Sequence, residues 1–568
     1  MTAAASIAYF SMEIALAEEL PTYSGGLGVL AGDTIRSAAD GEVPMVAVSL
    51  VHRKGYFRQR LSPEGWQSEE PVPWSPEDRL AELAERATLN LEGRDVVIRA
   101  WRYDVTGVKG FVVPVLLLDT DLPENAEADR RITDHLYGGD IRYRLRQEAV
   151  LGIGGVRMLR ALGYTAIRRY HMNEGHAALL LLELGYEEMR RRGMTRVTRE
   201  LAAVVKPTAV FTTHTPVPSG HDQFPLAMVQ EVVSGYPGVF TERAREFCLD
   251  NVLNMTYLAL DNSHYINGVA KKHGETSRQM FAQFQIDSIT NGVHVGFWTA
   301  PPIRALFDRH ITAWREDNAS LRYALGIPRP EFWAAHQTCK EELIHDVNER
   351  AQAGMFSNVF TLGFARRATT WKRADLLLHD LQRLLAVNAH AGPLQIIYAG
   401  KAHPHDQGGK EMIRRIFEAI GTLRGKLNIV YLEDYDMALA KKLVAGVDVW
   451  LNTPQPPLEA SGTSGMKAAI NGVPQLSVLD GWWIEGCIEG VTGWAIGGNN
   501  QNASPGTGDD HAAEAESLYN KLENVILPLY YRQQERFVEI MRHTIALNGS
   551  FFNTERMVDQ YVRKAYLK

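Results

Sequence analysis

The chain has 568 residues, and its 60 Lys and Arg against 67 Asp and Glu give a formal net charge of −7 at pH 7. At roughly 100–200 residues per domain, this length favours about two to four domains with large cores. The acidic balance argues against nucleic-acid binding, which needs a basic surface, and no apolar run approaches the roughly 18 residues of a membrane helix. Three cysteines without CxxC spacing exclude a disulfide scaffold and a thiolate zinc site. We expect a soluble cytoplasmic protein, because the N-terminus also lacks the basic residue of a secretory signal.

Short β-branched runs alternate with longer amphipathic stretches along the chain. The runs that predict strands are residues 96–101, 111–118, 209–213, 359–364, 394–399, 428–432, 447–451 and 475–478. The stretches that predict helices include residues 142–162, 376–387, 411–423 and 437–445. This alternation is typical of parallel sheets covered by helices on both faces. The sequence therefore predicts an α/β fold with its ligands at the carboxyl ends of the strands.

One change of pattern divides the chain. From about Pro301 to Gly354 the sequence becomes helical and charged, and a new series of strands and helices starts at Val359. We therefore expect two sheet domains, residues 1–295 and 296–568, with a helical connection at 301–355 and a cleft between them. The last segment, residues 518–568, looks helical and could cross back to the first domain.

A glycine-rich segment, Ser24-Gly-Gly-Leu-Gly28, leads into a helical pattern. Glycines before a helix let backbone N–H groups approach an anion closely, and the helix dipole favours the negative charge. A tight turn alone would need the same residues.

Four cations lie within eight residues directly after the predicted strand 359–364, in the segment Arg366-Arg-Ala-Thr-Thr-Trp-Lys-Arg373. Arg offers planar bidentate contacts and Lys a point charge, and both suit phosphate. The position at a strand's carboxyl end favours an oxyanion site over a solvated basic face.

A run of small residues, Glu459-Ala-Ser-Gly-Thr-Ser-Gly-Met-Lys467, precedes another predicted helix. The N–H groups of Thr463, Ser464 and Gly465 could cradle a phosphate. A free lysine in the first turns of a helix opposes the helix dipole. Lys467 is better explained as an amine that bonds a cofactor aldehyde.

Polar clusters also follow several strands, and the first holds His171, Glu174 and His176. Two histidines five apart could suggest a metal, but they lack the HExxH spacing, so we expect no metal site. Polar strand ends that line a cleft suit the many hydroxyl contacts of a sugar.

Together these segments resemble the α-glucan phosphorylase family, which includes glycogen, starch and maltodextrin phosphorylases, in a short bacterial-type form. The matching segments are YFSME (9–13), SGGLG (24–28), THT (213–215), SHYINGVA (263–270), TNGVH (290–294), RRATTWK (366–372), GKA (400–402) and EASGTSGMK (459–467). The resemblance implies the GT-B architecture of two Rossmann-like domains with the active site in the cleft. It also implies phosphorolysis: orthophosphate cleaves the terminal α-1,4-linked glucose of an α-glucan and releases α-glucose 1-phosphate with retained configuration.

The family resemblance also implies a role for each matching residue. Lys467 would hold pyridoxal 5′-phosphate, whose 5′-phosphate exchanges a proton with the substrate phosphate. Lys372 would contact the cofactor phosphate and Arg367 the substrate phosphate. The N–H groups of the cofactor loop would bind the cofactor phosphate, and its residues are Gly462, Thr463, Ser464 and Gly465. Gly25 and Gly26 would offer N–H groups to the reacting phosphate. The residues that would hold the glucosyl hydroxyls are His214, Asn291, Glu459, Ser461 and Gly462.

Two alternatives remain beside this interpretation. A nucleotide-sugar glycosyltransferase of the same fold, such as a glycogen synthase, resembles this chain at Glu459, but many of these enzymes carry a second glutamate where this chain has Lys467. A catalytically dead glucan-binding module would have lost the lysine or the cationic cluster, and both are present. The resemblance further implies a homodimer. It also implies activity without AMP control, because no long regulatory segment precedes Tyr9.

One departure from the family pattern concerns Asp436. Better-known members carry Tyr-Arg after the strand 428–432, and that arginine helps to neutralise the cofactor phosphate, whereas this chain reads Tyr435-Asp436. We expect Asp436 to turn away and cap the helix that begins at Met437.

Overall fold

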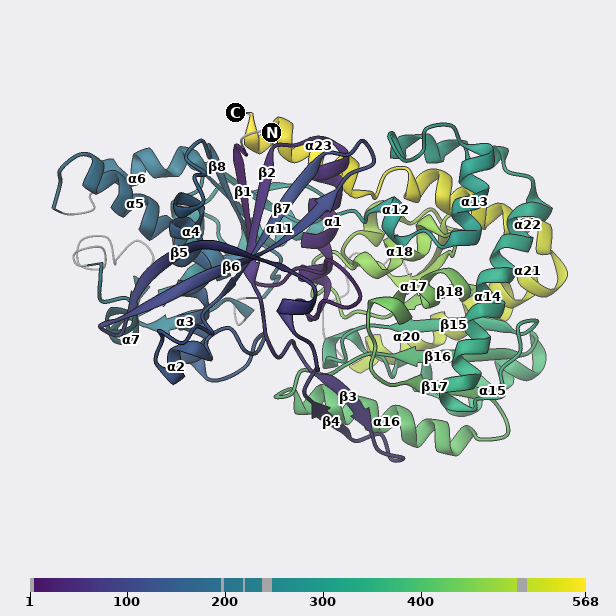
Figure 1. The fold of residues 1–568 in the computed structure, drawn as a ribbon. Helices are drawn as coiled ribbons and strands as arrows, with labels where there is room; N and C mark the ends of the chain where they lie inside the picture. Colours follow the sequence, from purple (N-terminus) through teal and green to yellow (C-terminus); the bar gives the residue numbers. More distant parts are fainter. Residues whose placement is uncertain (1–4, 196–198, 218–219, 237–247, 498–507, 568) are drawn as a thin grey trace. The chain divides into compact units, whose positions relative to one another are not determined.

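The computed structural model describes residues 5–195, 199–217, 220–236, 248–497 and 508–567. The chain forms two units (Figure 1). Unit 1 comprises Met1–Phe57, Pro71–Thr290 and Met557–Lys568, and unit 2 comprises Arg58–Glu70 and Asn291–Arg556. The change of unit after Thr290 lies close to the boundary expected at 295/296. One short segment is grouped differently from that expectation, since 58–70 belongs to unit 2. Residues 557–568 are grouped with unit 1, in line with a last segment that crosses back.

Nine strands of the described part of unit 1 form one sheet, in the order β14-β13-β9-β8-β1-β2-β7-β6-β5. Their bounds are β1 (Ile7–Ser11), β2 (Met45–Leu50), β5 (Ala81–Leu91), β6 (Arg94–Thr106), β7 (Val112–Asp119), β8 (Arg169–Asn173), β9 (Ala209–Thr212), β13 (Tyr265–Gly268) and β14 (Asp287–Ser288). The pairs from β14 to β7 are parallel, and β6 and β5 add an antiparallel edge. In this sheet, the strands from β2 to β7 lie on one side of β1, and the strands that follow from β8 onward lie on its other side. The switch point of the sheet therefore lies between β1 and β8, where an open α/β sheet binds its ligands.

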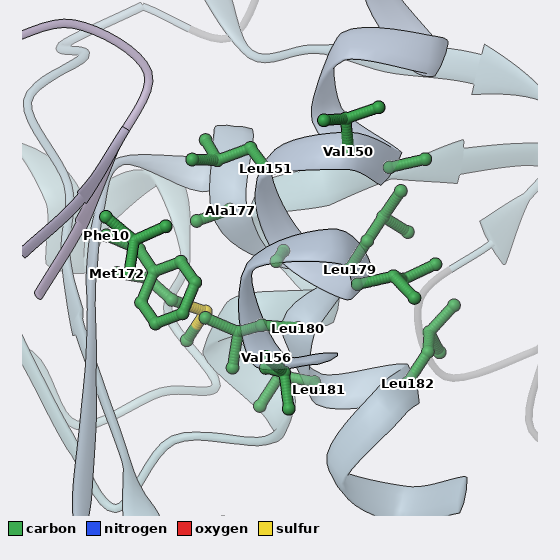
Figure 2. Packing of buried hydrophobic residues seen from close by; sticks show 14 of the residues in the cluster. Phe10, Val150, Leu151, Val156, Met172, Ala177, Leu179, Leu180, Leu181 and Leu182 are labelled. Atoms are coloured by element: carbon green, nitrogen blue, oxygen red, sulfur yellow. The ribbon is translucent and has the colours of Figure 1, made fainter. Parts of the chain in front are cut away.

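The core of unit 1 joins this sheet to a long helical segment. The predicted helix 142–162 forms as α3 (Ile141–Ala149), a π-helical turn (Val150–Gly154) and α4 (Gly155–Ala161). Its buried face packs with Phe10 and Met172 of the sheet and with the leucines that open α5 (Leu180–Arg191) (Figure 2). Residues of α1 (Gly26–Asp40) pack with Ile7 and Tyr9 and with the C-terminal Met557 and Tyr561 in a second core cluster. The remaining helices that the structure describes here are α2 (Glu127–Arg130), α6 (Arg199–Val205), α7 (Leu226–Val232), α10 (Met255–Asp261) and α11 (Lys271–Met280).

The main sheet of unit 2 is wholly parallel over its described strands, in the order β17-β16-β15-β18-β19-β20. Their bounds are β15 (Phe360–Ala365), β16 (Leu394–Ala399), β17 (Asn428–Leu432), β18 (Val449–Asn452), β19 (Gln475–Val478) and β20 (Gly493–Ile496). Counted along the chain this order is 3-2-1-4-5-6, that of a doubly wound dinucleotide-binding sheet. The α/β fold with parallel sheets is therefore confirmed. The switch point lies between β15 and β18.

The helices of unit 2 include a long element of the expected helical connection, α14 (Arg329–Ala351). The others are α12 (Val295–Trp298), α13 (Pro301–His310), α15 (Leu381–His390), α16 (Gln407–Leu423), α17 (Met437–Gly446), α18 (Thr463–Ile470), α19 (Trp483–Gly486), α20 (Gly508–Lys521), α21 (Leu527–Arg532), α22 (Gln534–His543) and α23 (Thr554–Tyr561), whose last residues belong to unit 1. The single helix predicted at 376–387 was wrong. Asp380 interrupts it, because its carboxylate accepts hydrogen bonds from the N–H groups of Gln382 and Arg383 and so begins α15. Among the residues described, no helix is both long and apolar enough to cross a membrane.

Candidate active site

Except for Asn291, the expected site residues of unit 2 follow the two strands at its switch point. Arg366 directly follows β15, and Arg367 and Lys372 lie in the same segment. The chain after β18 leads through Glu459 into α18. Because carboxyl ends of neighbouring parallel strands meet at one edge of the sheet, both segments reach the position where such sheets bind ligands.

Glu459 holds two cations from the segment after β15. Its Oε2 accepts hydrogen bonds from Arg366 Nη2 at 2.5 Å and from Lys372 Nζ at 3.2 Å. The three side chains are only 6–11% exposed. Burial alone would raise the pKa of the Glu459 carboxyl, but Arg366 and Lys372 hold it below its usual value. Burial and the charge of Arg366 lower the pKa of Lys372 to about 7, against the attraction of Glu459. This cluster therefore has more positive than negative charge in a largely dry environment.

The other two cations of the segment have different surroundings. Arg367 is exposed. Arg373 donates to the carbonyl oxygens of Thr453 (3.0 Å) and Pro454 (2.6 Å) and pairs with Glu514, so it fixes the chain after β18. The sequence pointed to the whole segment as an oxyanion site, and the family resemblance singled out Arg367 and Lys372 for phosphate without giving Arg366 a role of its own. Its position as the first residue after a buried strand was the signal that could have identified it.

The loop that begins at Glu459 is clamped by residues 480–482. Asp480 Oδ2 accepts from the N–H of Glu459 at 2.9 Å, and the N–H of Trp482 donates to the carbonyl of Ser461 at 2.9 Å. Gly481 has φ +53°, and a Cβ there would lie 2.5 Å from that same carbonyl, so only glycine fits. Ser461 Oγ is buried and has no hydrogen-bond partner within the protein. It is therefore available to a bound molecule.

The N-terminus of α18 directly follows this loop. Gly462 is its N-cap residue with φ +85°, and no side chain caps the first turn. The N–H groups of Thr463, Ser464 and Gly465 therefore have no capping side chain, and uncapped N–H groups at a helix start are able to bind an anion. A Cβ on Gly465 would lie 1.5 Å from Gln475 Oε1 and 3.0 Å from the Trp482 ring, so any larger residue there would displace the buried Gln475 side chain.

Lys467 lies on the same helix and is 7% exposed. Its Nζ is 3.9 Å from the centre of the Trp298 ring. Asn471 tethers the two, because its side-chain amide donates to the carbonyl oxygens of Trp298 and Lys467, each at 2.9 Å. Asn291, also expected at the site, presents a buried Oδ1 with no partner within the protein, while its carbonyl accepts from Arg556 at 3.0 Å.

In unit 1 the glycine-rich segment binds a carboxylate of the chain itself. Glu13 Oε2 accepts from the N–H groups of Ser24 (2.5 Å) and Gly25 (3.1 Å), and its Oε1 accepts from the Tyr137 hydroxyl at 2.9 Å. The carboxylate thus satisfies the N–H groups of Ser24 and of the N-cap residue Gly25, where the helix dipole favours a negative charge. The N–H of Gly25, expected to face a phosphate, is thus directed at Glu13 in this structure. Gly26 begins α1, and a Cβ there would meet nothing within 4 Å.

His214 follows β9 and is held by the last residue of β8 and by the residue after it. Its Nε2 lies 2.6 Å from Asn173 Oδ1, and its N–H donates to Glu174 Oε2 at 2.8 Å. Burial lowers the pKa of His214 to about 3, so the ring is neutral. Glu174 has φ +76° and is 6% exposed, and burial raises its pKa to about 7 although it accepts several hydrogen bonds. An unusual backbone conformation and a perturbed carboxyl together are typical of functional sites.

A cavity of about 450 Å³ in unit 1 is lined by Tyr137, Arg144, His221 and Asp222, among others. Arg144 lies over the Tyr137 ring at 4.4 Å and pairs with Asp222 at 3.2 Å. Asp222 also lies 3.3 Å from His176 Nε2. The sequence analysis missed Tyr137, Arg144 and Asp222, since only the fold brings these three parts of the chain together.

His171 does not join this group. It is buried, and its two ring nitrogens contact the hydroxyls of Tyr566 (2.7 Å) and Thr212 (2.8 Å). Over the parts of the chain that the structure describes, no group of three or more His, Cys, Asp or Glu residues could hold a metal ion.

Sequence comparisons with known proteins identify the family of this chain. Residues 163–493 match the family model for carbohydrate phosphorylases. The chain is 40% identical to the maltodextrin phosphorylase of Thermococcus litoralis and 39% identical to the glycogen phosphorylase of Mycobacterium tuberculosis, over 99% of this chain and 70% of each relative. It is 35% identical to the glycogen phosphorylase of Aquifex aeolicus, over 99% of this chain and 86% of that protein. The chain therefore belongs to the carbohydrate phosphorylase family.

Proposed function

We propose that this enzyme is an α-glucan phosphorylase, which uses orthophosphate to release the terminal α-1,4-linked glucose of an α-glucan as α-D-glucose 1-phosphate, with retained configuration. The observation that carries the proposal is the cluster of Arg366 and Lys372 on Glu459, beside a helix N-terminus with a buried lysine. This arrangement concentrates groups that bind phosphate next to a carboxylate that can accept sugar hydroxyls. The names of the relatives support the same activity.

Pyridoxal 5′-phosphate fits the residues of unit 2. Lys467 offers a buried amine, and the first N–H groups of α18 form an uncapped anion site in the same helix. Ser461 Oγ provides a buried hydroxyl without a protein partner. When bound, this cofactor supplies a phosphate group that can exchange a proton with the substrate phosphate. Lys467 would hold the cofactor, and the N–H groups of Thr463 to Gly465, with Lys372, would bind its phosphate.

The cations of the segment after β15 offset the repulsion between two phosphates. Two like charges a few ångströms apart repel by several kcal/mol at an effective dielectric of about 20. Lys372 and Arg366 are already desolvated, so they act without further loss of hydration. Arg367 is exposed and free of the Glu459 pair, and it would bind the incoming substrate phosphate.

The glucosyl group would be held by residues of both units. Glu459, Ser461, Gly462 and Asn291 belong to unit 2, and His214 belongs to unit 1. His214 is neutral and its side chain is fixed by Asn173, so its backbone carbonyl could face the positive charge that develops on the sugar ring. Gly26 would contribute its N–H group to the reacting phosphate, whereas the N–H of Gly25 is directed at Glu13. We propose that the two units form the halves of a GT-B enzyme and act on one substrate.

The presence of a lysine at position 467 argues against the alternative activity of a nucleotide-sugar glycosyltransferase, because many of those enzymes carry a glutamate at this position to bind the donor ribose. We further propose that the enzyme is a cytoplasmic homodimer. The three cysteines are free, which suits a reducing compartment.

Two measurements test the proposal. Incubation with maltodextrin and inorganic phosphate is expected to release glucose 1-phosphate, whereas incubation with a nucleotide-activated glucose and maltodextrin is expected to extend no chain. Borohydride reduction and peptide mapping are expected to place a pyridoxyl label on Lys467, and Lys467→Ala should carry none. Chain extension from the nucleotide sugar, or a fully active protein labelled elsewhere, would contradict the proposal.

A further inference from the structure

A β-hairpin from the N-terminal part of the chain, β3 (Arg58–Leu61) and β4 (Gln67–Glu70), is part of unit 2. It lies beside α16 (Figure 1), and Leu61 packs with Phe417 and Tyr431 around a small cluster of Ala368, Ala402 and Ile413. Its turn contains Gly65 at φ +85°, where a Cβ would lie 2.6 Å from the Phe417 ring. The hairpin is therefore closely packed on this unit.

Two buried glutamines of the hairpin bind backbone groups of the loop after β16. Gln59 is 0% exposed, and its Nε2 donates to the Gly400 carbonyl at 2.9 Å and to Gln67 Oε1 at 2.8 Å. Gln67 Oε1 accepts from the N–H of Ala402, and its Nε2 donates to the Ala402 carbonyl, both at 2.9 Å. The Gln67 amide therefore pairs with the backbone of Ala402 as a neighbouring strand would.

Gln59 also binds the loop after β17. The Gln59 N–H donates to Asp434 Oδ1 at 3.0 Å, and the Asp434 N–H donates to Gln59 Oε1 at 2.9 Å. Lys401 Nζ lies 2.6 Å from the same Asp434 oxygen. One side chain thus ties together the loops that follow two neighbouring strands.

The loop held by the glutamines lies directly against the segment that carries the cations. The N–H of Ala368 donates to the Lys401 carbonyl at 2.9 Å, and the N–H of Arg366 donates to the Ala399 carbonyl at 3.2 Å. A Cβ on Gly400, at φ +148°, would lie only 1.9 Å from the Arg366 carbonyl. Any displacement of residues 400–402 therefore displaces the backbone of Arg366 and Arg367, since the two segments have no slack between them.

We propose that Gln59 and Gln67 are positioning residues for the phosphate site, which set the backbone of residues 366–368 through Gly400 and Ala402. The inference rests on the proposed function, in which Arg367 binds the substrate phosphate and Arg366 offsets the repulsion between the two phosphates. Neither glutamine would contact substrate or cofactor directly. Their loss leaves the cations present but misplaced, and a shift of about 1 Å in a positioned group is enough to lower activity strongly.

The test compares the holoenzyme variants Gln59→Met and Gln67→Met, in which the side chain keeps its length but loses its amide. Each is expected to raise the KM for phosphate at least five-fold, with the KM for maltodextrin changed less than two-fold. As a readout other than activity, we expect the melting temperature of these variants to rise less with added inorganic phosphate than that of the unmodified protein.

Gln395→Met is the matched control. Gln395 is also buried, and its side-chain amide donates to the carbonyl of Phe356 at 2.9 Å and to Thr361 Oγ1 of β15 at 2.8 Å, but it lies at the other end of β16. It is expected to lower the melting temperature without changing the KM for phosphate. Ser68→Ala, on an exposed position of the hairpin, should change neither.

The positioning role would be overturned if the hairpin variants behaved like Gln395→Met. They would then have a lower melting temperature, an unchanged KM for phosphate and unchanged stabilisation by phosphate. If a Met variant does not fold, Gln67→Asn replaces it, because asparagine retains the amide on a side chain one methylene shorter. This variant should raise the KM for phosphate by a smaller factor. An unchanged KM for phosphate in Gln67→Asn would also overturn the positioning role. An unmodified protein that neither releases glucose 1-phosphate nor is stabilised by phosphate would instead refute the proposed function.

Discussion

The carboxylate of Asp436 accepts a hydrogen bond of 2.8 Å from the backbone N–H of Leu439, so Asp436 is the N-cap of α17. This contact confirms the expectation that Asp436 caps a helix at the position where better-known family members carry an arginine. A carboxylate at a helix N-terminus satisfies an unpaired N–H and favours the helix dipole. The cations near the proposed cofactor phosphate must therefore come from elsewhere, and Arg366 and Lys372 are the buried ones in the cluster on Glu459.

Because Asp436 acts as a helix cap, substitutions of Asp436 should change the free energy of unfolding slightly and leave the affinity for the cofactor unchanged. Asp436→Asn keeps an oxygen that can accept from Leu439, so the free energy of unfolding should change by about 1 kcal/mol or less, whereas Asp436→Ala should lose about 1 kcal/mol. Denaturant unfolding measures both changes. Cofactor affinity, measured by titration of the apoprotein, should stay nearly constant, and a large change in it would mean that Asp436 faces the cofactor phosphate.

Arg366 and Arg367 should respond differently to the same substitution. Arg367→Ala removes an exposed side chain, so stability should change by about 0.5 kcal/mol or less, while the KM for phosphate should rise at least ten-fold because a charged contact is lost. Arg366→Ala breaks a buried ion pair with Glu459. It should lower the free energy of unfolding by about 3 kcal/mol in addition to raising the KM for phosphate. Thermal unfolding and phosphate kinetics separate the two. An unchanged phosphate dependence in Arg367→Ala would remove that residue from the substrate-phosphate site.

The lowered pKa of Lys372, about 7 against an ordinary value of 10.5, predicts pH-dependent anion binding in protein freed of cofactor. Lys372 is charged below pH 7 and loses its proton as the pH rises above it. Binding of sulfate, which keeps its charge over this range, should therefore weaken several-fold from pH 6 to pH 8.5. Lys372→Arg should make the binding independent of pH, because arginine stays charged. Calorimetric titration tests this, and a pH-independent affinity in the unmodified apoprotein would contradict it.

Glu174 predicts a pH dependence of stability. Its pKa is raised from 4.5 to about 7, so between these values the folded state binds more protons than the unfolded state. The free energy of unfolding should therefore fall as the pH rises from about 4.5 to 7, by up to about 3 kcal/mol from this group. Glu174→Gln keeps an oxygen acceptor for the His214 N–H but does not titrate, so its unfolding should show a flatter profile. Denaturant curves at pH 5 and pH 8 provide the comparison, and parallel profiles would show that Glu174 does not titrate as expected.

The sequence by itself determined much of unit 2. Strands 394–399, 428–432 and 475–478 begin and end as predicted, because buried parallel strands read as continuous apolar runs. The small-residue loop before Lys467 and the cations after β15 were recognisable because their composition is hard to explain by packing alone. The helix start at Asp436 was likewise a local signal, since a cap acts within a few residues.

Only the tertiary structure decided which of these groups meet. Arg366 and Glu459 are 93 residues apart in sequence, and Gln59 is 341 residues from Gly400. No periodicity or composition reports such contacts. The first depends on the strand order 3-2-1-4-5-6, which brings β15 beside β18, and the second depends on the packing of the β3–β4 hairpin on unit 2. The tertiary structure also decides which of the two adjacent arginines, Arg366 or Arg367, is buried. Two adjacent arginines are alike in sequence, and the packing around the end of β15 buries the first and leaves the second exposed.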